Sequence, residues 1–366
     1  MKIGILTFHR AHNYGAVLQC YALQELLKSL GYNVQVIDYR PNYIENAYLL
    51  LPNRWVESRS IFHFLKMKIR DVILLPVRYI RGRRFKAFVN KYLDLSAPCT
   101  EVNIPSDYDV YIVGSDQIWN KSITKGFDRV FFCDFGFEKK NRKYLSYAAS
   151  TELSDISNDD ADFLEFHLNR FDAVSVRESA LSNYIKDNLK KDVSVVVDPT
   201  LLNGKMFWDK LVSSEAKDGD YILLYQARYN AELTRKAKEI AKKMNCKLVE
   251  MSAWTIPLSR MCTKGMYASP LDFLSLIKNA KMVLNTSFHG TVFSIIYGIP
   301  FYYVELYDGW DSRAISLLSD LYLTDRIVSL DNCFESVAQS NVNFLESHRL
   351  LANLRNKSKQ FLYNNI

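Results

Sequence analysis

The sequence has few of the residues that cross-link a chain or make it flexible. Cysteine accounts for only 6 of its 366 residues, and no two cysteines have the CxxC spacing of a zinc or redox site. We therefore expect free thiols in a reducing cytoplasm and no bound metal. Glycine, with 13 residues, and proline, with 9, are also scarce, which argues against a long disordered linker.

Long apolar runs are missing as well. No stretch of about 18 consecutive apolar residues occurs, so no transmembrane helix is expected. The apolar run in the opening residues MKIGILTFHRAHNYG is too short for a signal peptide and predicts a first strand instead. Together with the cysteine content, these absences predict a cytoplasmic location.

Positive charge is modest but unevenly distributed. The net charge is +7, and residues 66–86 alone contain eight Lys or Arg against one Asp. No nucleic-acid-binding module accompanies this segment, so we expect no nucleic-acid partner. A basic and apolar segment suits peripheral contact with an anionic membrane surface, such as the inner face of the cell membrane, or with a lipid phosphate. It equally suits an ordinary helix pair with a solvated basic face.

A regular alternation of strand and helix patterns runs along most of the chain. Strands are predicted over 2–8, 33–39, 107–116, 141–150, 172–178 and 193–202. After a shift in composition at 211–220, a second alternation runs from YILLYQA to PFYYVE. This pattern predicts two doubly wound, Rossmann-like α/β domains that face each other across a cleft, over 1–210 and 218–331. The tail over 332–366 is predicted to be helical, and one possibility is that it packs back onto the first domain.

Polar residues at the ends of strands are candidates for a site, because ligands of doubly wound sheets bind there. His12 and Asn13 follow the first strand, and Asp116, Gln117 and Trp119 follow the strand predicted over 107–116. A carboxylate and an amide suit hydrogen bonds to a sugar, and an indole suits stacking on one. The alternatives are that Asn13 only caps a helix and that the loop with Asp116, Gln117 and Trp119 only packs against the protein.

Two charged residues mark strand ends in the middle of the chain. Arg177 follows VSV, where a guanidinium can clamp a phosphate or a carboxylate in bidentate fashion. Asp198 precedes Pro199 at the end of the strand predicted over 193–202. The alternatives are a surface pair of Arg177 with Glu178 and an aspartate that only ends its strand.

A histidine lies between a buried strand and a buried helix in NTSFHGTVFSIIYGIP, residues 285–300. The strand ends at Ser287, and His289 and Gly290 begin the helix. A neutral imidazole at a helix N-terminus can act as a general base, and a protonated one can donate to a leaving oxygen. A lone histidine is usually structural, but this position at a strand end favours a function.

The combination of these motifs resembles the polysaccharide pyruvyl transferase family. The matching stretches are NYGAVLQCYAL, DVYIVGSDQIWN, SVRES, VDPTLL and TSFHGTVFSIIYGIPF, in family order over roughly residues 1–305. The resemblance implies a GT-B-like fold and the transfer of the enolpyruvyl unit of phosphoenolpyruvate to a sugar of a cell-surface polysaccharide precursor. The product would be a pyruvate ketal, phosphate would leave, and no cofactor other than this co-substrate would be needed. The sugar acceptor is expected to be lipid-linked in one version of this scheme.

The resemblance also implies roles for individual residues, with the donor site largely in the C-terminal domain. His289 and Asp116 are expected to be catalytic, with Asp116 on the acceptor side. The expected donor-binding residues are Arg177, Asp198, Ser287, Gly290 and Thr291. The expected acceptor-binding residues are His12, Asn13, Gln117 and Trp119.

One position departs from the family pattern. Better-known members carry an arginine two residues before the histidine, whereas this chain has Ser287 there. Lys264, Arg228 and Arg313 are candidates to supply the missing cation. Two alternatives therefore stay open: a GT-B glycosyltransferase that uses a nucleotide sugar, and a non-catalytic member that kept the fold.

Overall fold

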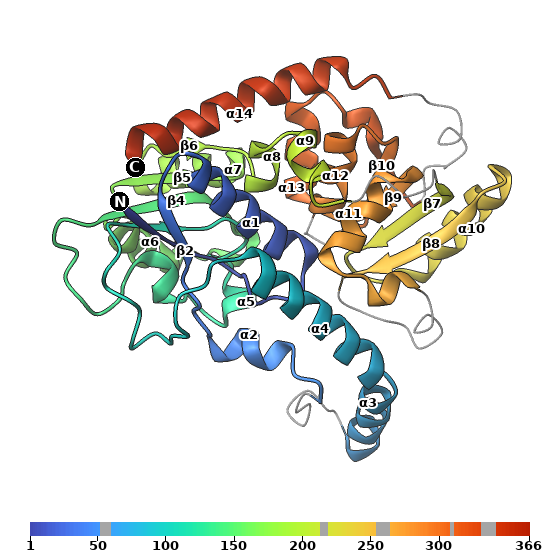
Figure 1. The fold of residues 1–366 in the computed structure, drawn as a ribbon, viewed down its shortest axis with the longest axis horizontal. Helices are drawn as coiled ribbons and strands as arrows, with labels where there is room; N and C mark the ends of the chain where they lie inside the picture. Colours follow the sequence, from blue (N-terminus) through green and yellow to red (C-terminus); the bar gives the residue numbers. More distant parts are fainter. Residues whose placement is uncertain (52–59, 213–218, 254–263, 308–310, 331–341) are drawn as a thin grey trace.

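The computed structural model describes residues 1–51, 60–212, 219–253, 264–307, 311–330 and 342–366. Its strands form two parallel sheets, one from the residues before 213 and one from the residues after 218. Figure 1 shows the sheets as two α/β units that lie next to each other, with helices on their faces. The predicted pair of doubly wound units is therefore confirmed.

The first sheet has the strand order β2-β1-β3-β4-β5-β6. Its strands are β1 (Lys2–Leu6), β2 (Asn33–Val36), β3 (Val110–Val113), β4 (Lys143–Ala149), β5 (Ala173–Val176) and β6 (Ser194–Val195). Its helices are α1 (Tyr14–Ser29), α2 (Asn42–Ala47), α3 (Ile61–Ile73), α4 (Leu75–Tyr92), α5 (Lys121–Thr124), α6 (Ala161–Leu168), α7 (Ser179–Leu189), α8 (Pro199–Leu202) and α9 (Lys205–Asp209). The order reverses between β1 and β3, so the loops after these strands flank a crevice.

The second sheet has the strand order β11-β10-β9-β7-β8. Its strands are β7 (Gly219–Gln226), β8 (Lys247–Ser252), β9 (Ala280–Asn285), β10 (Phe301–Glu305) and β11 (Ile327–Ser329). Its helices are α10 (Ala231–Lys243), α11 (Pro270–Lys278), α12 (Phe288–Tyr297), α13 (Ser312–Asp320) and the C-terminal α14 (Leu345–Asn365). Here the order reverses between β7 and β9, which places a second crevice at the ends of these strands.

The two units share one apolar core. A single cluster of buried side chains extends from the first sheet through α1 and α8 to α11 and α12 of the second unit. Tyr14 stacks on Phe273 with ring centroids 4.8 Å apart, and its hydroxyl donates to the Ala268 carbonyl at 3.2 Å. Trp208 meets Phe293 edge-on at 4.9 Å. Burial of these large rings holds the units together and fixes the geometry of the crevices between them.

The C-terminal helix α14 returns to the first unit. Arg355 Nε donates to the Leu201 carbonyl at 2.7 Å, and Ser358 Oγ accepts from the Val197 amide at 2.9 Å. At its end, Lys143 Nζ donates to the Asn365 carbonyl at 3.1 Å. Figure 1 shows α14 running across the top of both units. Residues 332–341 of the predicted helical tail lie outside the described residues.

One predicted strand is wrong in part. The segment 193–202 was expected to be a strand up to Asp198, but β6 covers only Ser194–Val195 and residues 199–202 form α8. The reason is local. Asp198 accepts from the Thr200 amide and Pro199 occupies the first helical position, which together form a strong helix start.

Among the helices in the described part of the chain, none combines the length and apolar character that a membrane span requires.

Candidate active site

A cavity of about 430 Å³ lies between the two units. Its lining comes from the N-terminus of α1 and from the loops that follow β3, β7, β9 and β10. At these places the strand order of a sheet reverses or a neighbouring strand ends. Its polar lining residues are Asn13, Asp116, Gln117, Arg228, Thr286, Ser287, His289, Asp311 and Arg313. Its apolar walls include Phe8, Ile44, Tyr48, Tyr225, Phe288 and Leu306. The cavity is therefore large enough and polar enough for a small charged ligand together with a sugar.

His289 reaches this cavity from the first turn of α12. Ser287 caps the helix, with its Oγ 3.5 Å from the Gly290 amide. The imidazole packs against Gly15 of the first unit so closely that a Cβ on that glycine would lie 1.9 Å from His289 Nδ1. The glycine of the NYGAV motif therefore leaves room for a histidine from the other unit.

The other ring nitrogen of His289 faces Asp198. The distance from Nε2 to Asp198 Oδ1 is 3.7 Å, which is an ion-pair distance but too long for a hydrogen bond. Within the described residues, this Nε2 has no hydrogen-bond partner although it is buried. A buried polar atom without a hydrogen-bond partner calls for an explanation, and a functional role for this cavity-lining histidine is one.

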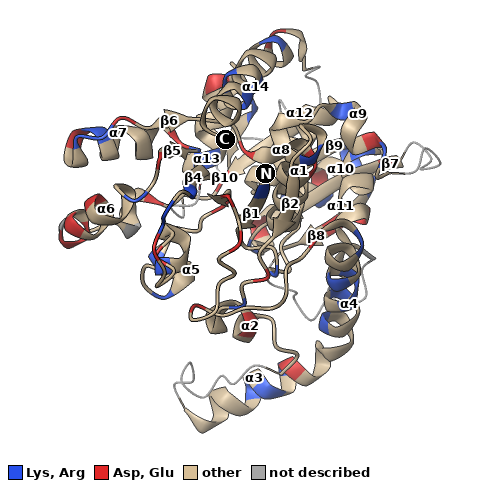
Figure 2. Ribbon diagram, turned by 60° about the vertical axis from the view of Figure 1, so that its left-hand side comes forward, with Lys and Arg blue, Asp and Glu red and all other residues tan. Residues whose placement is uncertain are grey.

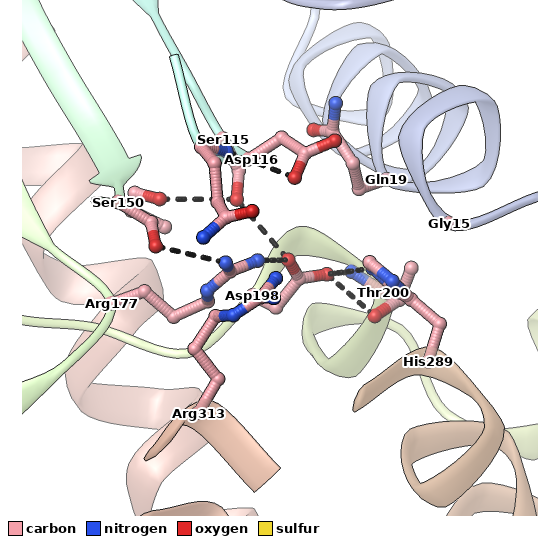
Figure 3. Close-up of polar contacts among 12 residues, drawn as sticks. Gly15, Gln19, Ser115, Asp116, Ser150, Arg177, Asp198, Thr200, His289 and Arg313 are labelled. Atoms are coloured by element: carbon pink, nitrogen blue, oxygen red, sulfur yellow. Dashed lines mark hydrogen bonds and ion pairs between the residues drawn. The ribbon is translucent and has the colours of Figure 1, made fainter. Parts of the chain in front are cut away.

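Asp198 is the centre of a saturated network, shown in Figure 3. One carboxylate oxygen accepts from Arg177 Nη1 at 2.9 Å and from Ser115 Oγ at 3.1 Å. The other accepts from the amide of Thr200 at 2.9 Å and from its hydroxyl at 2.6 Å. Burial alone would raise the pKa of Asp198, but the nearby His289, together with Arg177 and Thr200, holds it well below its usual range. Asp198 is therefore a fixed negative charge beside the imidazole.

Arg177 donates hydrogen bonds to residues of its own unit. Besides Asp198, its guanidinium donates to Glu178 Oε1 at 2.8 Å and to Ser150 Oγ at 3.0 Å. It also lies over the ring of Phe288 at 4.7 Å from the centroid. Burial alone would lower the pKa of Arg177, but Glu178 and Asp198 raise it above its usual value. The geometry favours a positioning role for Arg177 over the direct anion clamp predicted from the sequence.

The cavity receives cations from the second unit instead. Of the three candidates for the missing arginine, Arg228 and Arg313 line the cavity, and the side chain of Lys264 lies outside the described part of the chain. Arg313 Nε is 3.3 Å from Glu152 Oε1 of the first unit. Figure 3 shows Arg313 approaching from α13 on one side of Asp198 and His289 from α12 on the other.

Glu152 is a functional candidate that the sequence did not reveal. It is buried after β4, where it accepts from Gln117 Nε2 at 3.0 Å and from Ser312 Oγ at 2.8 Å as well as pairing with Arg313. Its contacts tie the loop after β3 to the N-terminus of α13. No spacing rule indicates such a role, since the partners are 35 and 160 residues away in the chain.

The predicted acceptor residues are brought together in part. Asn13, Asp116 and Gln117 line the cavity. Asn13 is also the cap of α1, because its side chain accepts from the Gly15 and Ala16 amides. Asp116 has a positive φ of 78° and accepts from the Gln117 amide at 2.9 Å, which fixes its carboxylate at the cavity wall.

Two of the predicted acceptor residues, Trp119 and His12, do not line the cavity. Trp119 is only 2% exposed, its indole donates to the Phe131 carbonyl at 2.9 Å, and it stacks on Phe132. Its apolar surface is therefore used up in the core of the first unit.

His12 turns away from the cavity and packs against Tyr48 and Phe85, with centroids 4.5 and 5.5 Å away. Burial, with Arg81 and Arg10, lowers the pKa of His12 to about 4, so it is neutral near pH 7.

Gly290 and Thr291 support the site from behind. Thr291 is fully buried and donates to Asn285 Oδ1 at 3.1 Å. A Cβ on Gly290 would lie 2.9 Å from both Asn285 and Tyr225, so the helix packs tightly on the strand ends there. Neither residue lines the cavity, so the geometry favours a supporting role over the predicted direct contact with the donor. They hold Ser287 and His289 in place.

The comparisons with known proteins agree with this geometry. UDP-N-acetylglucosamine 2-epimerase from Rickettsia bellii matches with a TM-score of 0.50 at 10% identity, over 99% of this chain and 96% of that one. UDP-GlcNAc 2-epimerase from Methanocaldococcus jannaschii matches with a TM-score of 0.45 at 12% identity, over 97% and 93%. A UDP-glucosyltransferase from Polygonum tinctorium matches with a TM-score of 0.41 at 10% identity, over 98% and 93%. The two parallel α/β sheets, together with the likeness to the Rickettsia bellii enzyme, identify the fold as GT-B-like.

Comparison with the curated proteins gives no match. The sequence profile described as polysaccharide pyruvyl transferase matches residues 13–307. Of the cavity residues named above, only Phe8, Asp311 and Arg313 lie outside this range. This stretch covers most of the chain and both of its sheets. The chain therefore belongs to the polysaccharide pyruvyl transferase family.

Proposed function

We propose that the protein transfers the pyruvate unit of phosphoenolpyruvate to a sugar of a polysaccharide precursor and forms a cyclic ketal. The observation that carries this proposal is the position of His289. His289 lines the interdomain cavity, and its Nε2 has no hydrogen-bond partner among the described residues and lies 3.7 Å from the fixed charge of Asp198. The family supports transferase chemistry, and the site suggests which groups perform it.

The second unit suits the donor. Phosphoenolpyruvate carries a phosphate and a carboxylate, so its site needs cations and N–H donors. Arg313 and Arg228 line the cavity on this side, and the N-terminus of α12 begins there at Ser287. A helix N-terminus favours anions through its free amides and its dipole. In this proposal Arg313 replaces the arginine that other family members carry before the histidine.

The reaction needs one proton at carbon and one at oxygen. Protonation of C3 of the enolpyruvyl unit makes C2 electrophilic, and a sugar hydroxyl oxygen then bonds to C2 and loses its proton. A second hydroxyl oxygen bonds to C2 as the C2–O bond to phosphate breaks, and its proton leaves with the phosphate. His289 is suited to carry these protons, because the Asp198 carboxylate at 3.7 Å stabilises the positive charge of a protonated imidazole.

The first unit suits the acceptor. Asp116 and Gln117 present a carboxylate and an amide to the cavity from the loop after β3, and Tyr48 and Phe8 provide apolar walls against which a sugar ring can pack. Asp116 is the candidate to accept a hydroxyl proton from the sugar. The acceptor and donor would then approach each other across the two crevices.

A calorimetric ligand panel tests the proposal. Wild type should bind phosphoenolpyruvate, and Arg313→Gln should weaken this binding by roughly tenfold, because a charged hydrogen bond to phosphate is lost. Arg349→Gln is the matched control, because Arg349 is an exposed arginine of α14 that pairs with Glu346. Binding of UDP-, GDP- or CMP-sugars in place of phosphoenolpyruvate would overturn the proposal in favour of a nucleotide-sugar glycosyltransferase.

A further inference from the structure

The outer surface of α3 exposes an unusual number of large apolar side chains. Figures 1 and 2 show this helix projecting from the first unit, away from both sheets. Phe62 is 75% exposed, Ile61 61% and Ile69 60%. The other exposed apolar side chains of the helix are Leu65, Val72 and Ile73. An apolar surface of this extent on a protruding helix marks an interaction site.

These side chains lie on one face. At about 100° per residue, all six fall within a sector of roughly 120° around the helix axis. The opposite face carries Phe64, Met67 and Asp71, which are half-buried or buried. The helix is thus amphipathic, but its larger apolar residues face outward instead of toward the core.

Basic residues border this apolar face. Lys66 and Arg70 are exposed next to it on one side, and Lys68 lies on the other. The acidic residue of the segment, Asp71, is 1% exposed and accepts from Arg78 Nη2 at 2.7 Å, so its charge is neutralised inside the protein. Figure 2 marks basic residues in blue on the ribbons of both α3 and α4. The surface is therefore apolar at its centre and positive at its margins.

Part of the basic segment has a different role from the one its sequence suggests. Arg81 is buried and donates to the carbonyls of Ser252 and Ala253 in the second unit, at 3.0 and 2.7 Å. Arg84 donates to the Tyr267 carbonyl at 2.7 Å. These two arginines join the units, so the surface-binding charges are those of α3 and the exposed Arg83 and Lys86 of α4.

A second group of exposed apolar side chains follows residues that line the active-site cavity. Ile44 and Tyr48 line that cavity, and Leu49, Leu50 and Leu51 follow them with their side chains exposed. Arg78 of α4 donates to the Leu50 carbonyl at 3.2 Å, which places this stretch beside the base of α3. The chain thus passes from the cavity lining to the neighbourhood of Arg78 within a few residues.

We propose that this face of α3 inserts into the headgroup region of a membrane that contains anionic lipids. An apolar stripe bordered by Lys and Arg is the pattern of interfacial helices, which bury one face in the acyl boundary and hold the basic residues at the phosphates. A second copy of the chain fits this face less well, because a symmetric contact would place positive margins against positive margins. The inference does not depend on the identity of the donor.

Vesicle flotation with the purified full chain tests this proposal. Wild type should float with vesicles of phosphatidylcholine and phosphatidylglycerol, and more weakly with phosphatidylcholine alone. Phe62→Ser combined with Ile69→Ser should lower the partition coefficient by roughly tenfold or more, since two buried apolar side chains are lost. Phe166→Ser is the matched control, because Phe166 of α6 is 64% exposed but lies outside this face.

A second pair of variants tests the charges. Lys66→Gln combined with Arg70→Gln should lower binding to the anionic vesicles by roughly tenfold and reduce its sensitivity to salt. Lys242→Gln with Lys243→Gln, on the exposed side of α10, removes the same charge elsewhere and should have little effect. Absence of wild-type flotation, or equal losses in the control variants, would overturn the proposal. So would a dimer in sedimentation without lipid that Phe62→Ser with Ile69→Ser converts to a monomer.

Discussion

The charged groups near the cavity have different surroundings in the two units. In the first unit, Arg177 and Asp198 bond to each other and to serine, threonine and glutamate partners, so that both oxygens of Asp198 are occupied. On the side of the second unit, His289 keeps one nitrogen without a hydrogen-bond partner among the described residues, and Arg313 reaches the cavity. The Arg177–Asp198 network of the first unit therefore fixes geometry and charge, and the second unit supplies the cations that line the cavity.

This difference matters because a cation must line the cavity to reach an anionic ligand there, and Arg313 lines it whereas Arg177 does not. Drawing Arg177 away from Asp198 and Glu178 would leave two buried carboxylates without their partner, which costs several kcal/mol. Arg313 Nε lies 3.3 Å from Glu152 Oε1, and Arg313 lines the cavity. The saturated network therefore acts on the reaction through the position of His289.

The largest effect is expected from His289→Ala. Loss of the proton-carrying imidazole should lower the turnover of phosphoenolpyruvate by about 10²- to 10⁴-fold, the usual range for a general acid or base. Phosphate release in the presence of acceptor measures it. His167→Ala, in α6 of the first unit, is the control that removes a histidine from outside the cavity. Retained turnover in His289→Ala would show that the open side of the cavity is not the reactive one.

Asp198→Asn should mainly reduce stability. It removes a buried charge partner of Arg177, which typically costs about 3–5 kcal/mol of unfolding free energy. Because the folded-state pKa of Asp198 is depressed, its contribution is complete above the unfolded pKa and declines as the pH falls below about 4. Urea unfolding should therefore show a wild-type advantage that is large at pH 7 and smaller at pH 3. An advantage that is independent of pH would contradict the assignment of charge.

Gly15→Ala should separate geometry from stability. The added Cβ would lie 1.9 Å from His289 Nδ1, so the imidazole must move, and a displacement of this size costs up to about a hundredfold in turnover. The free energy of unfolding should change little, because the higher helix propensity of alanine, about 1 kcal/mol, opposes the cost of moving the imidazole. In a His289→Ala background the substitution should cost nothing further. Gly204→Ala is the control, since a Cβ there meets nothing within 4 Å.

Glu152→Gln should have the smallest effect. A glutamine can still hydrogen-bond Ser312 but holds the Arg313 guanidinium less firmly, so the KM for phosphoenolpyruvate should rise by roughly fivefold with kcat nearly unchanged. Glu239→Gln, on the exposed face of α10, is the control. Tighter binding in Glu152→Gln would mean that Glu152 competes with the ligand for Arg313.

The sequence predicted the two sheets and the site at their strand ends because both follow from local patterns. Strand and helix periodicity and the position of His289 before a helix can be read within short windows. Trp119 and His12 could not be excluded in this way, because their packing partners lie outside such a window. Trp119 donates to the carbonyl of Phe131, and His12 packs against Phe85 of α4. The charge partners of Arg177 and the role of Glu152 are likewise set by tertiary packing.

The most direct test of the contrast between the two sides is X-ray diffraction from crystals soaked in phosphoenolpyruvate. We predict that the phosphate or the carboxylate of the ligand lies within hydrogen-bond distance of Arg313 and the N-terminus of α12, with Arg177 still bonded to Asp198 and Glu178. A ligand bound by Arg177, with its bonds to these carboxylates broken, would contradict the account.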